Sequence, residues 1–164
     1  MPGPIAAVGV RRGRPPVAPA FVMGLGLGGF IDGIALHQIL QWHHMLTGEG
    51  GGEPMDTVAG LETNTLVDGF FHLATWILVV IATTLLVRAW QRDELAPPWR
   101  VHVGLLLIGW GVFNLVEGVI DHQLLGIHHV RDDLGGPLGW DLGFLGIGAL
   151  LVLGGALLAR PRHR

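Results

Sequence analysis

The chain has 164 residues, of which 50% are hydrophobic and only 14% are charged, and its formal net charge is −3. Soluble domains carry about 25% charged residues, and a soluble chain of this length has too little interior to bury so much apolar surface. Composition therefore excludes an ordinary soluble domain. The absence of cysteine excludes disulfides and thiolate metal sites, and the lack of a basic patch argues against nucleic-acid binding.

The predicted elements begin with a tail rich in Pro, Gly and Arg at residues 1–16, expected to be disordered and cytoplasmic. Four apolar stretches follow, each near the roughly 20 residues that a helix needs to cross a bilayer. We expect one four-span transmembrane domain over residues 17–160, with the spans at about 21–46, 66–87, 101–127 and 138–159. The predicted fold is all-α, a polytopic membrane four-helix bundle. The lipid bilayer is its expected partner, while a homo-oligomer or contacts with other membrane proteins stay open.

Arginine sets the expected orientation. Every arginine except Arg131 lies in the N-terminal tail, in the middle loop at residues 88–100 or in the C-terminal tail. Four spans place those three segments on one side of the membrane. By the positive-inside rule we expect a multi-pass protein of the inner cell membrane with both termini cytoplasmic, so that the first and third loops lie outside.

Glycine is unusually frequent, with 27 residues. Small residues let helices approach closely in lipid, where no hydrophobic force drives them together. We expect this role for glycines inside the first and last spans, namely Gly24, Gly26, Gly28, Gly29, Gly33, Gly143, Gly146, Gly148, Gly154 and Gly155.

The sequence contains an internal repeat. Residues 32–44 read D-G-I-A-L-H-Q-I-L-Q-W-H-H and residues 117–129 read E-G-V-I-D-H-Q-L-L-G-I-H-H, at an offset of 85 (122 − 37), with six of the 13 positions identical. A matching H-Q-x-L-x-x-H-H does not arise from the chance alignment of apolar residues. It predicts two repeated two-helix hairpins, related by an axis along the membrane normal.

These motifs resemble those of a family of small bacterial predicted membrane proteins of unknown function. The resemblance rests on G-F-I-D-G-I-A-L-H-Q-I-L-Q-W-H-H at 29–44, V-D-G-F-F-H at 67–72 and N-L-V-E-G-V-I-D-H-Q-L-L-G-I-H-H-V-R at 114–131. It covers nearly the whole chain apart from the tails. The resemblance implies four spans and no established activity.

Acids and histidines gather in one half of the predicted spans. On an α-helix, Glu117, Asp121 and His128 fall within about 40° of one another, and His122 and His129 form a second stripe. A straight helix would separate the Asp32 level from the His-His pair by about 18 Å, with the acids near mid-membrane and the pair near the outer surface. Charged groups are costly in a bilayer, and no Arg or Lys lies within these motifs to compensate them.

A divalent cation would compensate the acids best, because imidazole and carboxylate on facing helices are how bundles build di-metal sites. The candidate ligands are the acids and histidines of the motifs: Asp32, His37, His43, His44, His72, Glu117, Asp121, His122, His128 and His129. Of these, His43 and His128 either bind metal or only support the ligands. Candidate supporting groups are Gln38, Gln123, Asp68, Asn114 and Asp141.

The chemistry of these ligands favours one or two transition-metal ions, with iron or copper preferred and zinc an option. Haem between His37 and His122 is a weaker alternative, because many carboxylates lie nearby. The favoured function is a metal-binding membrane protein with a dinuclear site toward the outer face, potentially a metal-dependent oxidoreductase whose catalytic residues the sequence does not identify. A protein that handles or delivers copper, a haem electron carrier, an ion or proton transporter and a purely structural polar network are the alternatives.

Overall fold

The computed structural model describes residues 15–94 and 96–161. The tail expected at residues 1–16 therefore lies, except for its last two residues, outside the described part. The described residues are all-helical: α1 (Ala18–Ile31) runs into the π-helix η1 (Asp32–Ile39), and α3 (Trp99–Glu117) into the π-helix η2 (Gly118–Leu125). The other elements are α2 (Val58–Gln91), the short 3₁₀ helix η3 (Asp132–Leu134) and α4 (Leu138–Ala159).

Four helical segments are long and apolar enough to cross a membrane: Ala18–Ile39, Val58–Gln91, Trp99–Leu125 and Leu138–Ala159. The predicted all-α fold with four spans is thereby confirmed. Large hydrophobic side chains along α2 and α4 are exposed, as lipid-facing residues are. The chain is a multi-pass membrane protein.

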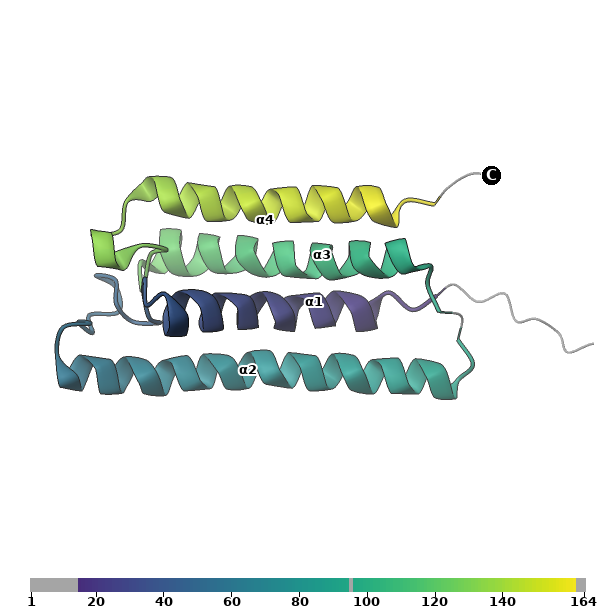
Figure 1. Cartoon of the computed structure of the whole chain (residues 1–164), viewed down its shortest axis with the longest axis horizontal. Helices are drawn as coiled ribbons and strands as arrows, with labels where there is room; N and C mark the ends of the chain where they lie inside the picture. Colours follow the sequence, from purple (N-terminus) through teal and green to yellow (C-terminus); the bar gives the residue numbers. More distant parts are fainter. Residues whose placement is uncertain (1–14, 95, 162–164) are drawn as a thin grey trace, which may run out of the picture.

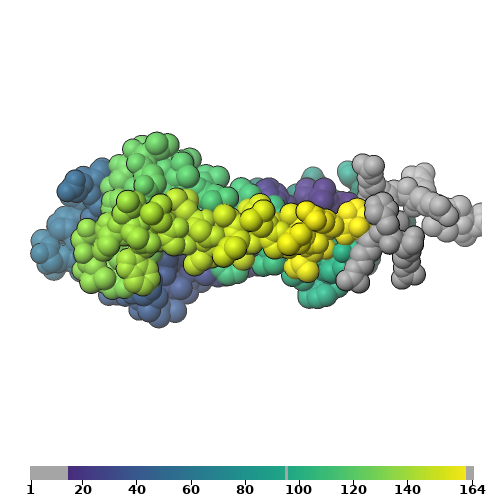
Figure 2. All heavy atoms as spheres, turned by 90° about the horizontal axis from the view of Figure 1, so that it is seen from above, coloured from purple at the N-terminus to yellow at the C-terminus, as the bar shows by residue number. Residues whose placement is uncertain are grey.

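The four helices lie side by side in the order α2, α1, α3, α4 (Figure 1). Helix α1 packs on α2 and α3, and α3 packs on α1 and α4, so the two central helices have neighbours on both sides. Among the described residues, no Cα atom of α4 lies within 8 Å of a Cα atom of α1 or η1. Seen from above, α4 runs along the near face of an elongated molecule (Figure 2). The row leaves α4 with a protein neighbour along one side only.

Close helix contacts use glycine, but not all of the expected ones. A Cβ on Gly109 would meet the Phe21 carbonyl of α1, and Gly148 lies against the Asn114 side chain of α3. In the last span, however, added Cβ atoms at Gly143, Gly146 and Gly154 would meet nothing within 4 Å. The expectation that these three glycines mediate packing is wrong, because they lie on the side of α4 that has no neighbouring helix.

Both central spans widen and then end abruptly at the same end of the molecule. In η1 the Leu40 and Trp42 amides donate to the Ala35 and Leu36 carbonyls, five and six residues back. The chain then turns through a left-handed residue, Gln41 at φ 51°, which Gly126 at φ 59° matches at the end of η2. The segment after each turn folds back toward the helix that it has just left. These returns place the His-His pairs beside the helix ends rather than beyond them.

Candidate metal centre

His37 lies on η1 and is completely buried. Its Nδ1 is 3.0 Å from Oδ1 of Asp68, a buried carboxylate on α2. Asp68 also accepts from His44 Nδ1 at 2.6 Å and from the Met45 amide at 3.0 Å. The Asp68 carboxylate therefore fixes the His37 ring and leaves its Nε2 facing the interior.

His122 lies at the matching position of η2 and is 2% exposed. Its Nδ1 is 3.5 Å from Oδ1 of Asp141 on α4, within ion-pair distance but not hydrogen-bonded. Asp141 accepts from His129 Nδ1 at 2.7 Å and from the Val130 amide at 3.0 Å. Asp141 thus makes contacts in the second half of the chain, from α3 to α4, that match those of Asp68 in the first half, from α1 to α2.

His43 and His128 join the two halves. Their rings stack with centroids 4.7 Å apart and planes 4° from parallel, and both side chains are completely buried. His43 Nδ1 donates to the Val130 carbonyl at 3.1 Å, and His128 Nδ1 donates to the Met45 carbonyl at 3.3 Å. Each half therefore supplies the backbone acceptor that orients the other half's histidine.

Among the described residues, five buried imidazole nitrogens have no hydrogen-bond partner: Nδ1 of His122 and the Nε2 atoms of His37, His43, His122 and His128. Since Nδ1 of His37, His43 and His128 is already engaged, the proton belongs there and Nε2 carries the lone pair. A buried polar atom without a partner is costly and calls for an explanation. A metal ion supplies one, because it binds the imidazole lone pair.

Asp32 and Glu117 stand where α1 passes into η1 and where α3 passes into η2. Both are nearly fully buried, and no oxygen of either carboxylate makes a hydrogen bond. Asp32 Oδ2 lies 3.0 Å from His37 Nε2, and Glu117 Oε1 lies 3.6 Å from His128 Nε2. No arginine pairs with either acid among the described residues. The two carboxylates complete a ring of oxygen and nitrogen donors.

Donor atoms converge in three overlapping groups, each with its atoms within 4.8 Å of one another. The groups are His37, His43 and His128; Glu117, His122 and His128; and Asp32, His37 and Glu117. These buried groups could hold a metal ion. All six of these side chains carry buried atoms without a hydrogen-bond partner, and Asn114 is the one other described side chain that does.

The pKa of the two stacked histidines agrees with this role. Burial lowers the pKa of His43 to about 4, although the Asp32 charge acts in the opposite direction. Burial, together with repulsion from His43, holds the pKa of His128 well below its usual value. Both rings are therefore neutral near pH 7, the form that binds metal.

The other candidate residues lie around the six converging side chains or apart from them. His44 and His129 contact the carboxylates of Asp68 and Asp141 and belong to none of the three converging groups. The Gln38 and Gln123 amides each donate to the same carboxylates at 3.2 Å.

Three further candidates lie outside the converging groups. His72 is half-buried and donates from Nδ1 to the Asp68 carbonyl within its own helix. Asp121 is half-buried, and Asn114 is buried with its Oδ1 unpartnered.

Sequence reasoning did not identify two features of the centre. One is the backbone carbonyls of Met45 and Val130, which lie two residues after His43 and His128 and carry no side-chain signal. The other is the return of the chain after each π-helix. A straight helix would carry His43 about 9 Å beyond His37 along its axis, whereas the two rings lie 4.5 Å apart, so the expectation that a straight helix runs through the His-His pair is wrong. The matching positions of Gln41 and Gly126 are the only sequence trace of that turn.

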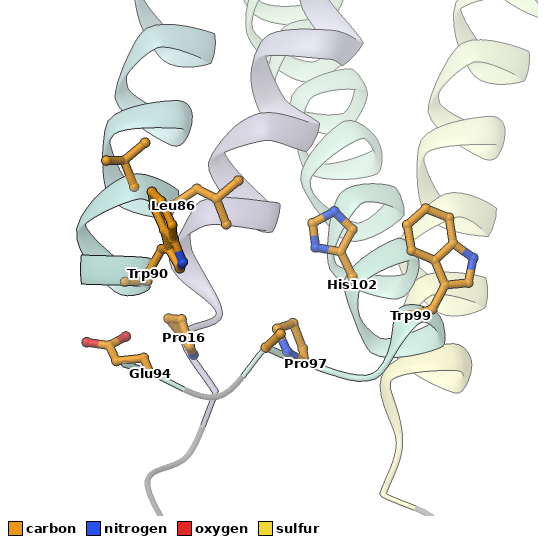
Figure 3. Close-up of a pocket in the computed structure, with 10 residues that line it drawn as sticks. Pro16, Leu86, Trp90, Glu94, Pro97, Trp99 and His102 are labelled. Atoms are coloured by element: carbon orange, nitrogen blue, oxygen red, sulfur yellow. The ribbon is translucent and has the colours of Figure 1, made fainter. Parts of the chain in front are cut away.

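A cavity also lies at the end of the molecule opposite the candidate centre. It has a volume of about 530 Å³ and lies between the end of α2, the start of α3 and the chain before α1 (Figure 3). Trp90, Trp99 and His102 are among the residues that line it, and the His102 ring stacks on the Trp99 ring with centroids 5.8 Å apart. No residue of the histidine–carboxylate ring lines it. The cavity is therefore separate from the candidate centre.

Comparison with known proteins gives one match. The model of a family described as predicted membrane protein (DUF2243) matches residues 19–162, which is most of the chain. No curated protein and no solved structure matches.

Proposed function

This chain belongs to the DUF2243 family of predicted membrane proteins, and from that premise we propose that it is a membrane metalloprotein holding two transition-metal ions. The ligands are His37, His43, His122 and His128 with the carboxylates of Asp32 and Glu117. One observation carries the proposal: these six buried side chains converge, and each presents an atom without a hydrogen-bond partner.

The donor set favours two ions rather than one. Four imidazoles and two carboxylates exceed what one ion needs, and helix-bundle di-metal sites use facing carboxylates and histidines in this way. Asp68 and Asp141 then act as the carboxylates that orient metal-bound histidines from behind. The ions offset the charge of Asp32 and Glu117, which is otherwise costly at this depth.

Imidazole and carboxylate ligands suit iron, copper or zinc, and iron or copper would make the centre redox-active. Haem fits poorly. The His43 ring lies 4.5 Å from the His37 ring, and the His128 ring lies 4.8 Å from the His122 ring. These two stacked rings occupy the space that a porphyrin between His37 and His122 would need. Full burial also favours a resident ion over a delivery site, because a delivered ion must be released readily.

The test is elemental analysis of detergent-purified protein, with optical and EPR spectra. We expect two ions per wild-type chain and loss of metal in His37→Ala and His122→Ala. His102→Ala is the matched control, since His102 lies at the opposite end, and it should keep the full metal content. Wild-type protein that is folded but holds neither metal nor haem would leave a structural polar network as the role of the cluster.

A further inference from the structure

A second, smaller cavity lies directly beside the candidate centre. It is a groove of about 250 Å³ between η1 and α4. Leu36 and Trp42 form one wall, and Gly143, Phe144 and Ile147 of α4 form the other. The groove exists because α4 packs on α3 and η2 but, among the described residues, not on η1.

Only one layer of residues separates this groove from the ligand histidines. Val130 lines the groove, and its carbonyl accepts the His43 Nδ1 hydrogen bond at 3.1 Å. Phe144 also lines it, and its ring lies 5.3 Å from the His122 ring. A molecule in the groove would therefore be separated by one layer of residues from two of the proposed ligands, His43 and His122.

The two halves of the chain differ in the residue at one position of this groove. Asp141 and Asp68 make matching contacts with the two histidine pairs, so the residues two positions beyond them correspond. After Asp68 that residue is Phe70, whereas after Asp141 it is Gly143, where an added Cβ would meet nothing within 4 Å. Glycine at this position keeps the groove open.

The lining identifies the kind of molecule that fits. The residues that line it are apolar, and among them only Trp42 and Trp140 carry a polar side-chain atom, the indole N–H. These two rings meet edge to face at 5.4 Å, and the Arg131 guanidinium lies 4.4 and 5.1 Å from them. Tryptophan and arginine mark the level of lipid headgroups. A hydrocarbon chain needs no hydrogen-bond partner and therefore fits the apolar part of this lining.

Access from water is restricted at this end of the molecule. His37, His43 and His128 have no exposed surface. The first loop lies across the end of η2, where Gly48 and Gly50 donate to the carbonyls of Ile127 and Gly126 at 2.8 and 2.9 Å. A water-soluble substrate would have to displace this loop, while a lipid-phase molecule meets an open groove.

We propose that this groove binds the hydrocarbon chain of a membrane lipid. We also propose that this bound lipid is the molecule held next to the metal centre. The first part concerns the groove alone. The second part rests on the proposed function, since it requires metal behind His43 and His122.

Lipid retention tests the first part. The full chain is purified from membranes in mild detergent, washed extensively and analysed for bound phospholipid by mass spectrometry, with and without metal. Gly143→Phe fills the groove. Gly154→Phe is the matched control, because it also points into open space but lies nearer the other end of α4. We expect retained phospholipid to fall several-fold in Gly143→Phe and to be unchanged in the control. Equal retention in all three proteins, or a retained quinone in place of phospholipid, would overturn this part.

A nitroxide-labelled phospholipid tests the second part. With a paramagnetic ion in the centre, the nitroxide EPR signal should broaden in wild type and in Gly154→Phe but not in Gly143→Phe, while all three keep their metal. Metal-loaded wild-type protein that retains the lipid without broadening would refute the second part alone. If no protein binds metal but Gly143→Phe still loses lipid, the groove assignment stands and the proposed function falls.

Discussion

Asp68→Asn probes the support behind His37 with the smallest change in shape. The carboxylate accepts from His37 Nδ1 at 3.0 Å and from His44 Nδ1 at 2.6 Å. An amide keeps only one accepting oxygen, so one of these bonds is lost or one ring moves its proton to Nε2. In His37 that proton would occupy the lone pair that binds metal. A hydrogen bond to a charged group contributes about 1.5–3 kcal/mol, so affinity should fall by about 10- to 100-fold.

The affinity is measured by chelator competition on folded, detergent-purified protein. Asp56→Asn is the matched control, because Asp56 is exposed in the first loop and should keep wild-type affinity. Asp141→Asn should cost less at His122, since the carboxylate there is 3.5 Å from Nδ1 and makes no hydrogen bond to it. If Asp68→Asn is folded and binds metal as tightly as Asp56→Asn, then Asp68 does not orient a ligand.

Three further outcomes are expected. Because burial lowers the pKa of His43 to about 4, the metal-free protein should lose stability as pH falls from 6.5 towards 4: the unfolded chain binds the proton first. His43 alone should lower the free energy of unfolding by about 2 kcal/mol between pH 7 and pH 5. The measurement is the unfolding temperature of wild type and of His43→Gln across this pH range, and the same pH dependence in both proteins would contradict the prediction. Gly109→Leu should separate α1 from α3, because its Cβ meets the Phe21 carbonyl, and lower the unfolding temperature, whereas Gly154→Leu should not. A single cysteine replacing Asp56, which is exposed in the first loop, but not one replacing Asp93, should react with an impermeant thiol reagent in intact cells; the reverse result would invert the proposed orientation.

The sequence predicted the fold class well because its signal is strong. Four apolar stretches of spanning length leave little choice of architecture in lipid, and Pro97 and Pro98 mark the break before α3. The order of the helices in the row is a different matter. It depends on which face of each helix carries close glycine contacts, and Gly143 and Gly148 look alike in sequence although only Gly148 packs on α3.

The candidate centre was predictable as a set of residue types rather than as a geometry. The repeat drew attention to His37, His43 and their counterparts, and the absence of basic partners suggested a metal. Helical periodicity then misled the detailed grouping, because it treated His43 as part of a straight helix. In the structure the helix widens, stops at Ile39 and turns back at Gln41, so His43 returns to lie beside His37. Periodicity carries no information about such a reversal.

The crossed hydrogen bonds between the halves also govern how the protein is made. His43 needs the Val130 carbonyl and His128 needs the Met45 carbonyl, while within the second half His129 needs Asp141 on the last helix. A ribosome delivers these segments one after another, so a half-inserted chain carries Asp32 and its histidines without the residues that enclose them. If the proposed function is right, metal loading would be complete only after α4 has entered the bilayer. A chain truncated before α4 would lack Asp141 and would leave the histidine–carboxylate cluster incompletely enclosed.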